Sequence, residues 1–595
     1  MPHHPPSLSL AGLRRAYAEG WTPRALVEHL LPLWAASESD AVWIARFGPA
    51  ELLARSAELE EWPVERRGPL WGVPFAVKDN IDVHGLPTTA ACPGFAYQPG
   101  ADATAVARLL ERGAICVGKA NLDQFATGLV GVRTPHGAAR NPFAAERIPG
   151  GSSSGSAAAV AMGLASFALG TDTAGSGRIP AGFTSTVGLK PTRGLVPASG
   201  VVPACRSLDC VSVFALEVVD AMTVLEVIAG PDGQDPLARI GRQLDFAGPV
   251  RLGVPRPADL DWLDGDGYAA AWDGWLASGQ HGTPKSIDMS PLLAAADLLY
   301  AGPWLAERVA AVGDFLRDRA EEVWPITRQI IEGGRHFSAV DAFRGRYRMA
   351  ELRGAARAVF ETIDVLVVPT APGHPTLAEV AAEPLTINAR LGRWTNFVNL
   401  LDLAAVAVPW SITEAGVPFG LTLVAPAFHD RALAALAQRV HRASGLPLGA
   451  TGAPQAEATP ELPAPERDVP LFVVGAHLRG QPLNQQLLAL GARFAGVART
   501  APGYRLFALR VVPEKPGLAR AVDAGEGASI EGELWRLDAG AFGQFVAAVP
   551  APMTIGTVEL EDGRLVKGFG CESWALRDAR DITAFGGWRA YLAAR

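Results

Sequence analysis

Two turns rich in glycine and serine constrain the fold of this chain most strongly. The first spans residues 149–156 (PGGSSSGS), and the second spans residues 170–177 (GTDTAGSG). Between them, residues 157–169 are apolar, which indicates a buried segment; a flexible Gly/Ser linker would not bracket such a segment. Small side chains let backbone N–H groups converge and stabilise a negative oxygen. The two turns therefore predict a site where serine hydroxyls lie beside backbone donors.

A lysine follows a short apolar strand well before these turns. Residues 75–77 (FAV) predict a buried strand, and Lys78 comes directly after it. Lysine at a strand end is commonly a surface residue. Burial, however, lowers the pKa of a lysine and makes it a base near neutral pH.

The second turn contains the favoured nucleophile. Nucleophilic catalysis needs a hydroxyl, a base within reach and donors for the oxyanion. No histidine near the turns stands in a triad signature, so Lys78 is the alternative base, and Ser152 would carry the proton between Lys78 and Ser176. The backbone amides of the three residues that immediately precede Ser176 could form an oxyanion hole; these residues are Thr173, Ala174 and Gly175.

Element patterning predicts two domains. Short strands alternate with helices over residues 1–447, which is typical of an α/β domain with a mixed or parallel sheet. Residues 448–468 are rich in proline and alanine without periodicity and predict a linker. Residues 469–595 then predict a smaller, strand-rich α+β domain.

Charge and cysteine usage narrow the function classes. The 595-residue chain has a net charge of −8, which argues against nucleic acid as a partner. Its five cysteines show no CxxC spacing, so neither a disulfide scaffold nor a metal site is expected. Neither a secretory signal nor a membrane-spanning run is apparent, and we expect a cytoplasmic enzyme without membrane association.

Three motifs in order resemble the amidase signature family. They are residues 72–79 (GVPFAVKD), the glycine- and serine-rich residues 150–180, and residues 189–194 (LKPTRG). The resemblance covers roughly residues 1–445 and implies an α/β domain whose mixed sheet is covered by helices. It also implies a Ser–cisSer–Lys triad and no cofactor.

In that resemblance the three catalytic residues have distinct roles. Ser176 would be the nucleophile, and Ser152 would be the middle serine, preceded by a cis peptide bond. Lys78 would be the base that starts the proton relay. Ser176 would then attack an amide carbonyl, ammonia would leave, and water would clear the acyl-enzyme.

A second stretch suggests how an anionic substrate is held. Tyr300 and Arg308 are eight residues apart, so on a single helix they would share a face. A phenol and a guanidinium make a reasonable clamp for a small carboxylate. The alternative is an ordinary surface helix with an Arg–Glu pair.

This stretch, the linker and residues 473–484 (VVGAHLRGQPLN) together resemble allophanate hydrolases. The final domain resembles the gamma-glutamyl-cyclotransferase-like fold. The resemblance implies that Tyr300 and Arg308 hold the carboxylate of allophanate, that the Gly128 loop lines the site, and that the products are N-carboxycarbamate and ammonia. The second domain would assist decarboxylation, giving two CO2 and two NH3 overall.

In the second domain, His477 is the candidate residue, because it follows an apolar strand and lies beside Arg479, where an anion could be met. A structural role in a turn is the alternative, and Glu531 and Glu533 are further candidates. The resemblance also implies a homodimer and a functional link to a separate urea carboxylase or to a triazine or biuret pathway enzyme. The remaining alternative is an amidase for another small amide, with a structural second domain.

Overall fold

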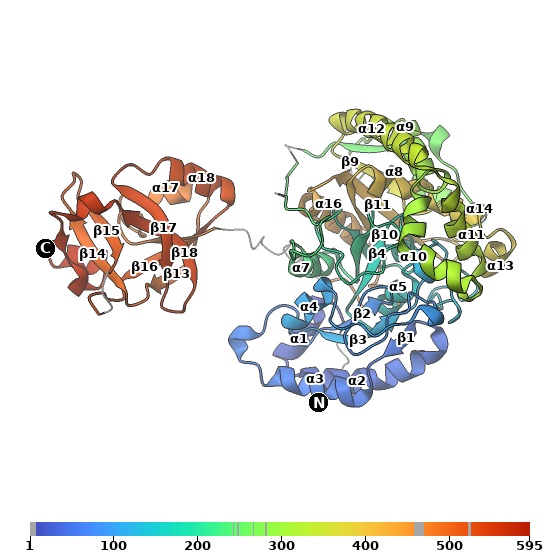
Figure 1. Ribbon diagram of the computed structural model, residues 1–595, viewed down its shortest axis with the longest axis horizontal. Helices are drawn as coiled ribbons and strands as arrows, with labels where there is room; N and C mark the ends of the chain where they lie inside the picture. The colour runs from blue at the N-terminus through green and yellow to red at the C-terminus, as the bar shows by residue number, and fades with distance from the viewer. Residues whose placement is uncertain are drawn as a thin grey trace. The chain divides into compact units, whose positions relative to one another are not determined.

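The chain divides into two compact units, Met1–Pro463 and Ala464–Arg595 (Figure 1). The computed structural model describes residues 7–595 except residues 242, 247–248, 264, 266, 280–281, 457–468 and 522–524. Each unit has its own hydrophobic core. Of the predicted linker, residues 457–468 lie outside the described residues, whereas Leu448 is buried in the first unit.

An eleven-stranded mixed sheet forms the centre of the first unit, in the order β1-β3-β2-β4-β6-β5-β10-β11-β9-β7-β8. This confirms the predicted α/β class. Its strands are β1 (Trp43–Arg46), β2 (Pro74–Lys78), β3 (Ile115–Ala120), β4 (Phe167–Asp172), β5 (Val187–Lys190), β6 (Cys210–Ala215), β7 (Leu252–Pro255), β8 (Lys285–Ile287), β9 (Val365–Pro369), β10 (Leu403–Ile412) and β11 (Pro418–Pro426).

Helices cover this sheet, with α7 and α16 on one side of it in Figure 1 and α5 on the other. The α-helices of the unit are α1 (Leu10–Ala18), α2 (Pro23–Ala36), α3 (Pro49–Glu60), α4 (Thr104–Glu111), α5 (Ser154–Ala161), α6 (Ile179–Phe183), α7 (Val218–Ile228), α8 (Tyr268–Ala277), α9 (Ser290–Ala301), α10 (Leu305–Arg319), α11 (Pro325–Gly333), α12 (Ala339–Thr362), α13 (Leu377–Ala382), α14 (Thr386–Leu391), α15 (Asn396–Leu400) and α16 (Asp430–Ala443).

The sheet brings the two sequence motifs together at one edge. Strands β2 and β4 are parallel neighbours, with Val77 paired to Leu169, so their carboxyl ends lie side by side. The apolar run between the two turns is divided between α5 and β4, and Gly163 adopts φ +68° in the turn that separates them. Lys78 and the second glycine-rich turn are therefore adjacent in space.

The second unit is α+β, as predicted. It contains a five-stranded sheet in the order β13-β16-β12-β18-β17 and a three-stranded sheet in the order β15-β14-β19. Its elements are β12 (Val469–Val473), α17 (Asn484–Ala489), β13 (Arg493–Arg499), β14 (Tyr504–Leu509), β15 (Lys515–Arg520), β16 (Glu531–Leu537), α18 (Ala539–Ala547), β17 (Met553–Glu559), β18 (Leu565–Cys571), β19 (Arg580–Asp581) and α19 (Trp588–Ala593). Across the described residues, none of the helices has the length and apolar character needed to cross a membrane.

Candidate active site

Lys78 ends β2 inside the protein, with its side chain fully buried. Its Nζ lies 2.8 Å from the Oγ of Ser152 and 2.8 Å from the Oγ1 of Thr171. Burial lowers the pKa of Lys78 to about 7, although nearby carboxylates, those of Asp123, Asp209 and Asp172, act in the opposite direction. A substantial fraction of the amine is therefore neutral at physiological pH and able to accept a proton.

Ser152 is held by backbone contacts on both sides. The peptide bond between Gly151 and Ser152 is cis. The carbonyl of Ser152 accepts a hydrogen bond from the Asp123 N–H at 3.0 Å, and the Gly151 N–H donates to the carbonyl of Leu129 at 2.8 Å. A Cβ at residue 151 would overlap the Asp123 carboxylate, so only glycine fits there.

A buried ion pair shapes the turn that carries Ser176. Asp172 and Arg178 are both fully buried, and the guanidinium donates to both carboxylate oxygens at 2.9 Å. The same carboxylate accepts the N–H groups of Gly175 and Gly177 at 3.1 and 2.9 Å. Burial acts to raise the pKa of Asp172, but Arg178 outweighs it and holds the pKa below its usual range. Asp172 thus stays ionised and fixes the turn.

The three predicted oxyanion donors are not equivalent. The N–H of Gly175 is already donated to Asp172, which makes Gly175 an unsuitable oxyanion donor. Within the described residues, the N–H groups of Thr173 and Ala174 have no hydrogen-bond partner. The Thr173 hydroxyl donates to Asp209 at 2.5 Å, which anchors that side of the turn.

Tyr300 and Arg308 lie on two consecutive helices, so the expectation of one continuous helix is wrong. Helix α9 ends at Ala301, and α10 begins at Leu305. Pro303 disfavours helical geometry at Gly302 and breaks the helix there. The turn nevertheless brings the guanidinium carbon of Arg308 to 5.6 Å from the centroid of the Tyr300 ring.

The two terminal nitrogens of the Arg308 guanidinium differ in their hydrogen bonding. The side chain is buried, at 2% exposure, and its Nη1 donates to the Oγ1 of Thr127 at 2.7 Å. Its Nη2 is buried and has no hydrogen-bond partner among the residues that the structure describes. A buried charged donor without an acceptor is costly and rare in proteins. The orphaned Nη2 is therefore the feature of this site that most directly calls for an anionic ligand.

The Gly128 loop connects the nucleophile with this arginine. The Oγ of Ser176 lies 3.5 Å from the carbonyl oxygen of Gly128, and Thr127, which binds Arg308, is the preceding residue. Arg133 is a second buried cation here: it donates to the carbonyl of Thr127 at 3.0 Å. Sequence reasoning missed Thr127, Thr171 and Arg133, of which only Thr171 lies in a motif that was singled out.

His477, the candidate in the second unit, follows β12 and packs among aromatic rings. Its ring stacks on Phe569 with centroids 5.1 Å apart and meets Phe545 edge-on at 5.0 Å. Its Nε2 lies 3.0 Å from the Oε1 of Gln486. Burial lowers the pKa of His477, so the neutral imidazole is favoured.

The arginine beside His477 is occupied by a carboxylate. Glu533 is fully buried and accepts the N–H and Nε of Arg479 at 2.8 and 3.2 Å and the Nη2 of Arg589 at 2.7 Å. The indole of Trp535 donates to it as well. Glu533 therefore holds this part of the unit together, and Arg479 is not free to meet an anion alone. Glu531 is exposed and lies 3.8 Å from Arg499.

Comparisons with known proteins match both units. The Amidase family model matches residues 27–434, and the model of the allophanate hydrolase C-terminal domain matches residues 469–593. The urea amidolyases of Saccharomyces cerevisiae and Lachancea kluyveri are each 42% identical, over 95% and 96% of this chain. The chain spans about a third of the length of these two relatives, 32% in each case.

Among solved structures, Kluyveromyces lactis allophanate hydrolase is 39% identical with a TM-score of 0.75, over 99% of this chain and 100% of that one. The K. lactis urea amidolyase structure gives the same identity and TM-score, with 37% of its chain covered. These matches also confirm the two-unit architecture. The chain belongs to the amidase family and carries an allophanate hydrolase C-terminal domain.

Proposed function

We propose that this protein is an allophanate hydrolase in which the first unit cleaves the terminal amide of allophanate. The observation that carries the proposal is the buried, unpartnered Nη2 of Arg308 beside the Ser176 loop. Allophanate combines a carboxylate, which satisfies that donor, with an amide carbonyl for the serine to attack. The likeness to K. lactis allophanate hydrolase over the full chain supports the same conclusion.

The reaction starts with proton transfer. In the neutral amine of Lys78, one N–H donates to the Oγ1 of Thr171, which leaves the nitrogen lone pair for the Ser152 hydroxyl 2.8 Å away. Lys78 takes the Ser152 proton as Ser152 takes that of Ser176, and the Oγ of Ser176 attacks the amide carbonyl. The developing oxyanion is stabilised by the amides of Thr173 and Ala174, each worth about 3–4 kcal/mol when well placed.

The tetrahedral intermediate on Ser176 then collapses to the acyl-enzyme. The proton held by Lys78 returns through Ser152 to the leaving nitrogen, and the carbon–nitrogen bond breaks to release ammonia. Water attacks the acyl-enzyme by the same relay and releases N-carboxycarbamate. No metal or cofactor takes part in these steps. Tyr300 and Arg308 hold the substrate carboxylate throughout, and the carbonyl of Gly128 lines the site beside Ser176.

The second unit assists the decarboxylation of N-carboxycarbamate, so that each allophanate gives two CO2 and two NH3. His477 is the residue that we propose for this role, because its pKa is lowered and it lies in the segment that follows β12. Residues 464–595 form a compact unit with their own core, which permits an independent assay. If the isolated unit does not accelerate loss of CO2 from N-carboxycarbamate, the role of the unit is structural. If His477→Ala decarboxylates as fast as the wild-type unit, the role of His477 is structural.

Two wider expectations belong to the same proposal. The match to urea amidolyases favours urea, rather than biuret or triazines, as the origin of the allophanate, with a urea carboxylation step as its source. We also propose a cytoplasmic homodimer, and light scattering of the purified protein tests the oligomeric state.

A substrate panel tests the proposed function. Purified protein is assayed for ammonia release from allophanate, biuret, glutamine and an aryl amide. We expect the highest kcat/KM for allophanate, because biuret and the aryl amide have no carboxylate for Arg308 to bind, and in glutamine three carbons separate the carboxylate from the amide carbonyl, against one nitrogen in allophanate. Preference for a large neutral amide would refute the assignment.

A further inference from the structure

A large cleft in the first unit borders the amidase centre, because Asp209, which lines the cleft, accepts a hydrogen bond from the Thr173 hydroxyl. The volume of the cleft is about 1130 Å³, which exceeds what a small anion such as allophanate requires and suits a drug- or nucleotide-sized ligand. Within the described part of the chain, Lys78, Ser152 and Ser176 do not line it. The cleft is formed by α10 and α12 together with residues 193–198, 206–209 and 235–239.

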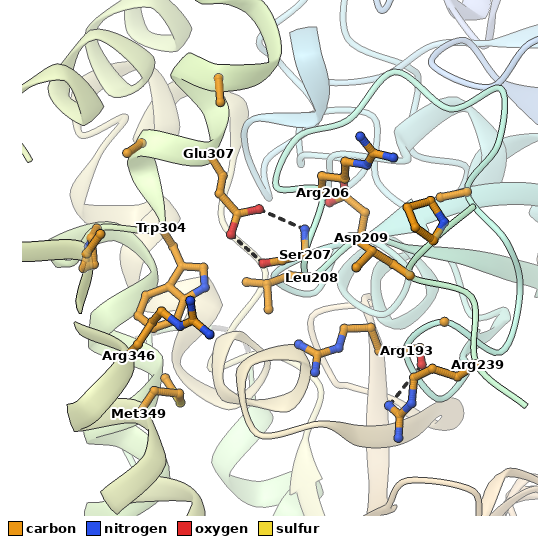
Figure 2. Close-up of a pocket in the computed structure, with 18 of the residues that line it drawn as sticks. Arg193, Arg206, Ser207, Leu208, Asp209, Arg239, Trp304, Glu307, Arg346 and Met349 are labelled. Atoms are coloured by element: carbon orange, nitrogen blue, oxygen red, sulfur yellow. Dashed lines mark hydrogen bonds between the residues drawn. The ribbon is translucent and has the colours of Figure 1, made fainter. Parts of the chain in front are cut away.

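Arginines from separate segments line this cleft. Figure 2 shows the guanidinium groups of Arg193 and Arg346 extending toward the space from opposite sides, whereas Arg206 turns away from it. Arg239 and Arg353 also line the cleft, and the Nη2 of Arg353 donates to the carbonyl of Leu400 at 2.9 Å. Burial lowers the pKa of Arg353, and the nearby Arg193 and Arg346 lower it further, whereas Asp402 acts in the opposite direction. Three like charges are thus held close together.

The carboxylates of the cleft are already engaged. Glu307 accepts the N–H of Ser207 at 2.9 Å and also its hydroxyl, as Figure 2 shows. Asp209 accepts from Thr173, and burial raises its pKa to about 6. Asp235 accepts the N–H groups of Ala198 and Leu237. These groups serve the local fold, so they do not neutralise the arginines by direct pairing.

Among the described residues, Arg346 has no hydrogen-bond or ion-pair partner, and Arg193 lies 3.8 Å from Asp402, a carboxylate that Arg239 binds at 2.7 Å. The excess positive charge is therefore available to a ligand.

Aromatic and apolar side chains complete the walls. Trp304 lines the cleft immediately before α10, and Phe343 and Tyr347 line it from α12. Phe343 is 55% exposed and Tyr347 is 66% exposed, an unusual position for two large rings on one helix turn. Aromatic faces beside guanidinium groups suit a ligand that has a flat ring and several negative charges.

We propose that this cleft binds a polyanion carrying a flat ring, the chemistry of a nucleotide, at a site that borders the amidase centre but does not include Lys78, Ser152 or Ser176. The phosphates meet Arg193, Arg346 and Arg353, and the ring lies against the aromatic wall. The occupant lies next to Glu307, the residue that precedes Arg308 on α10. This inference does not depend on the identity of the amide substrate.

Isothermal titration of the full chain with three probes tests the proposal in the absence of amide substrate. ATP supplies ring and charge, sodium triphosphate supplies charge alone, and adenosine supplies the ring alone. We expect ATP to bind at least tenfold more tightly than either of the other probes. No binding of ATP at millimolar concentration, or equal binding of triphosphate, would overturn the proposal.

Variants locate the binding. Arg193→Gln and Arg346→Gln should each weaken ATP binding about tenfold to a hundredfold, because each removes a charged hydrogen bond. Arg344→Gln is the matched control. Arg344 lies on α12 like Arg346, its side chain is 76% exposed, and it is not among the residues that line the cleft. If all three variants bind ATP with the affinity of wild type, and circular dichroism shows that each is folded, the ATP site lies elsewhere and the assignment is contradicted.

Discussion

Replacing Arg308 by alanine should remove the preference for an anionic substrate. Within the described part of the chain its Nη2 is buried and unpartnered, whereas its Nη1 is bound to Thr127, so the substrate carboxylate loses a buried charged donor. Truncating one partner of a buried charge pair costs about 2–5 kcal/mol. At 1.36 kcal/mol per factor of ten, kcat/KM for allophanate should fall about thirtyfold to several thousandfold, mainly through KM.

Biuret provides the matched measurement, since it replaces the carboxylate of allophanate by a neutral amide. Ammonia release is measured for both compounds with wild type, Arg308→Ala and Arg308→Lys. For biuret, kcat/KM should change by less than about tenfold in Arg308→Ala, and Arg308→Lys should retain part of the allophanate activity. Thermal melting controls for misfolding. An equal loss on both compounds, or an unchanged KM for allophanate, would refute the proposed role of Arg308.

Four further outcomes are expected. The pH profile of kcat/KM should show an acidic limb with an apparent pKa near 7, because protonated Lys78 cannot accept a proton. An acidic limb with an apparent pKa far from 7 would exclude Lys78 as the base. Thr171→Val should move that limb to lower pH, since the hydroxyl accepts from the ammonium, whereas Thr171→Ser should leave it in place. Asp172→Asn should lower the free energy of unfolding by about 3–5 kcal/mol in denaturant titration, because it leaves Arg178 buried without its carboxylate. Glu533 has a depressed pKa, so its stabilisation is complete above its ordinary pKa of 4.5 and is lost as the pH falls below it; Glu533→Gln should melt earlier than wild type at pH 7, and this difference should shrink as the pH is lowered below 4.5.

Features encoded locally were predictable from the sequence. The apolar residues before Lys78 form β2, and the second glycine-rich turn joins β4 to α6. Parallel pairing of β2 with β4 then brings Lys78 beside Thr171 at the start of the second turn, and the Lys78 Nζ also lies 2.8 Å from the Oγ of Ser152 in the first turn. Motif spacing carries this information because strand ends and tight turns are short-range features.

Features that depend on distant packing were not predictable. The hydrogen bond from Arg308 to Thr127 joins residues 181 positions apart, and no periodicity in either segment signals it. The eight-residue spacing of Tyr300 and Arg308 predicts two turns of one helix, but Pro303 breaks the helix at Gly302. The pairing of Arg479 with Glu533 likewise depends on the register of β16 against β12.

Ammonia release from allophanate by Ser176→Ala, measured beside wild type, tests the central claim most directly. Ser156→Ala is the control, because that hydroxyl lies in the first turn but donates to the carbonyl of Leu169 at 3.0 Å. We predict ammonia release by wild type and by Ser156→Ala, and none above the uncatalysed rate by Ser176→Ala. Full activity in Ser176→Ala, or no activity of wild type on allophanate, would contradict the account.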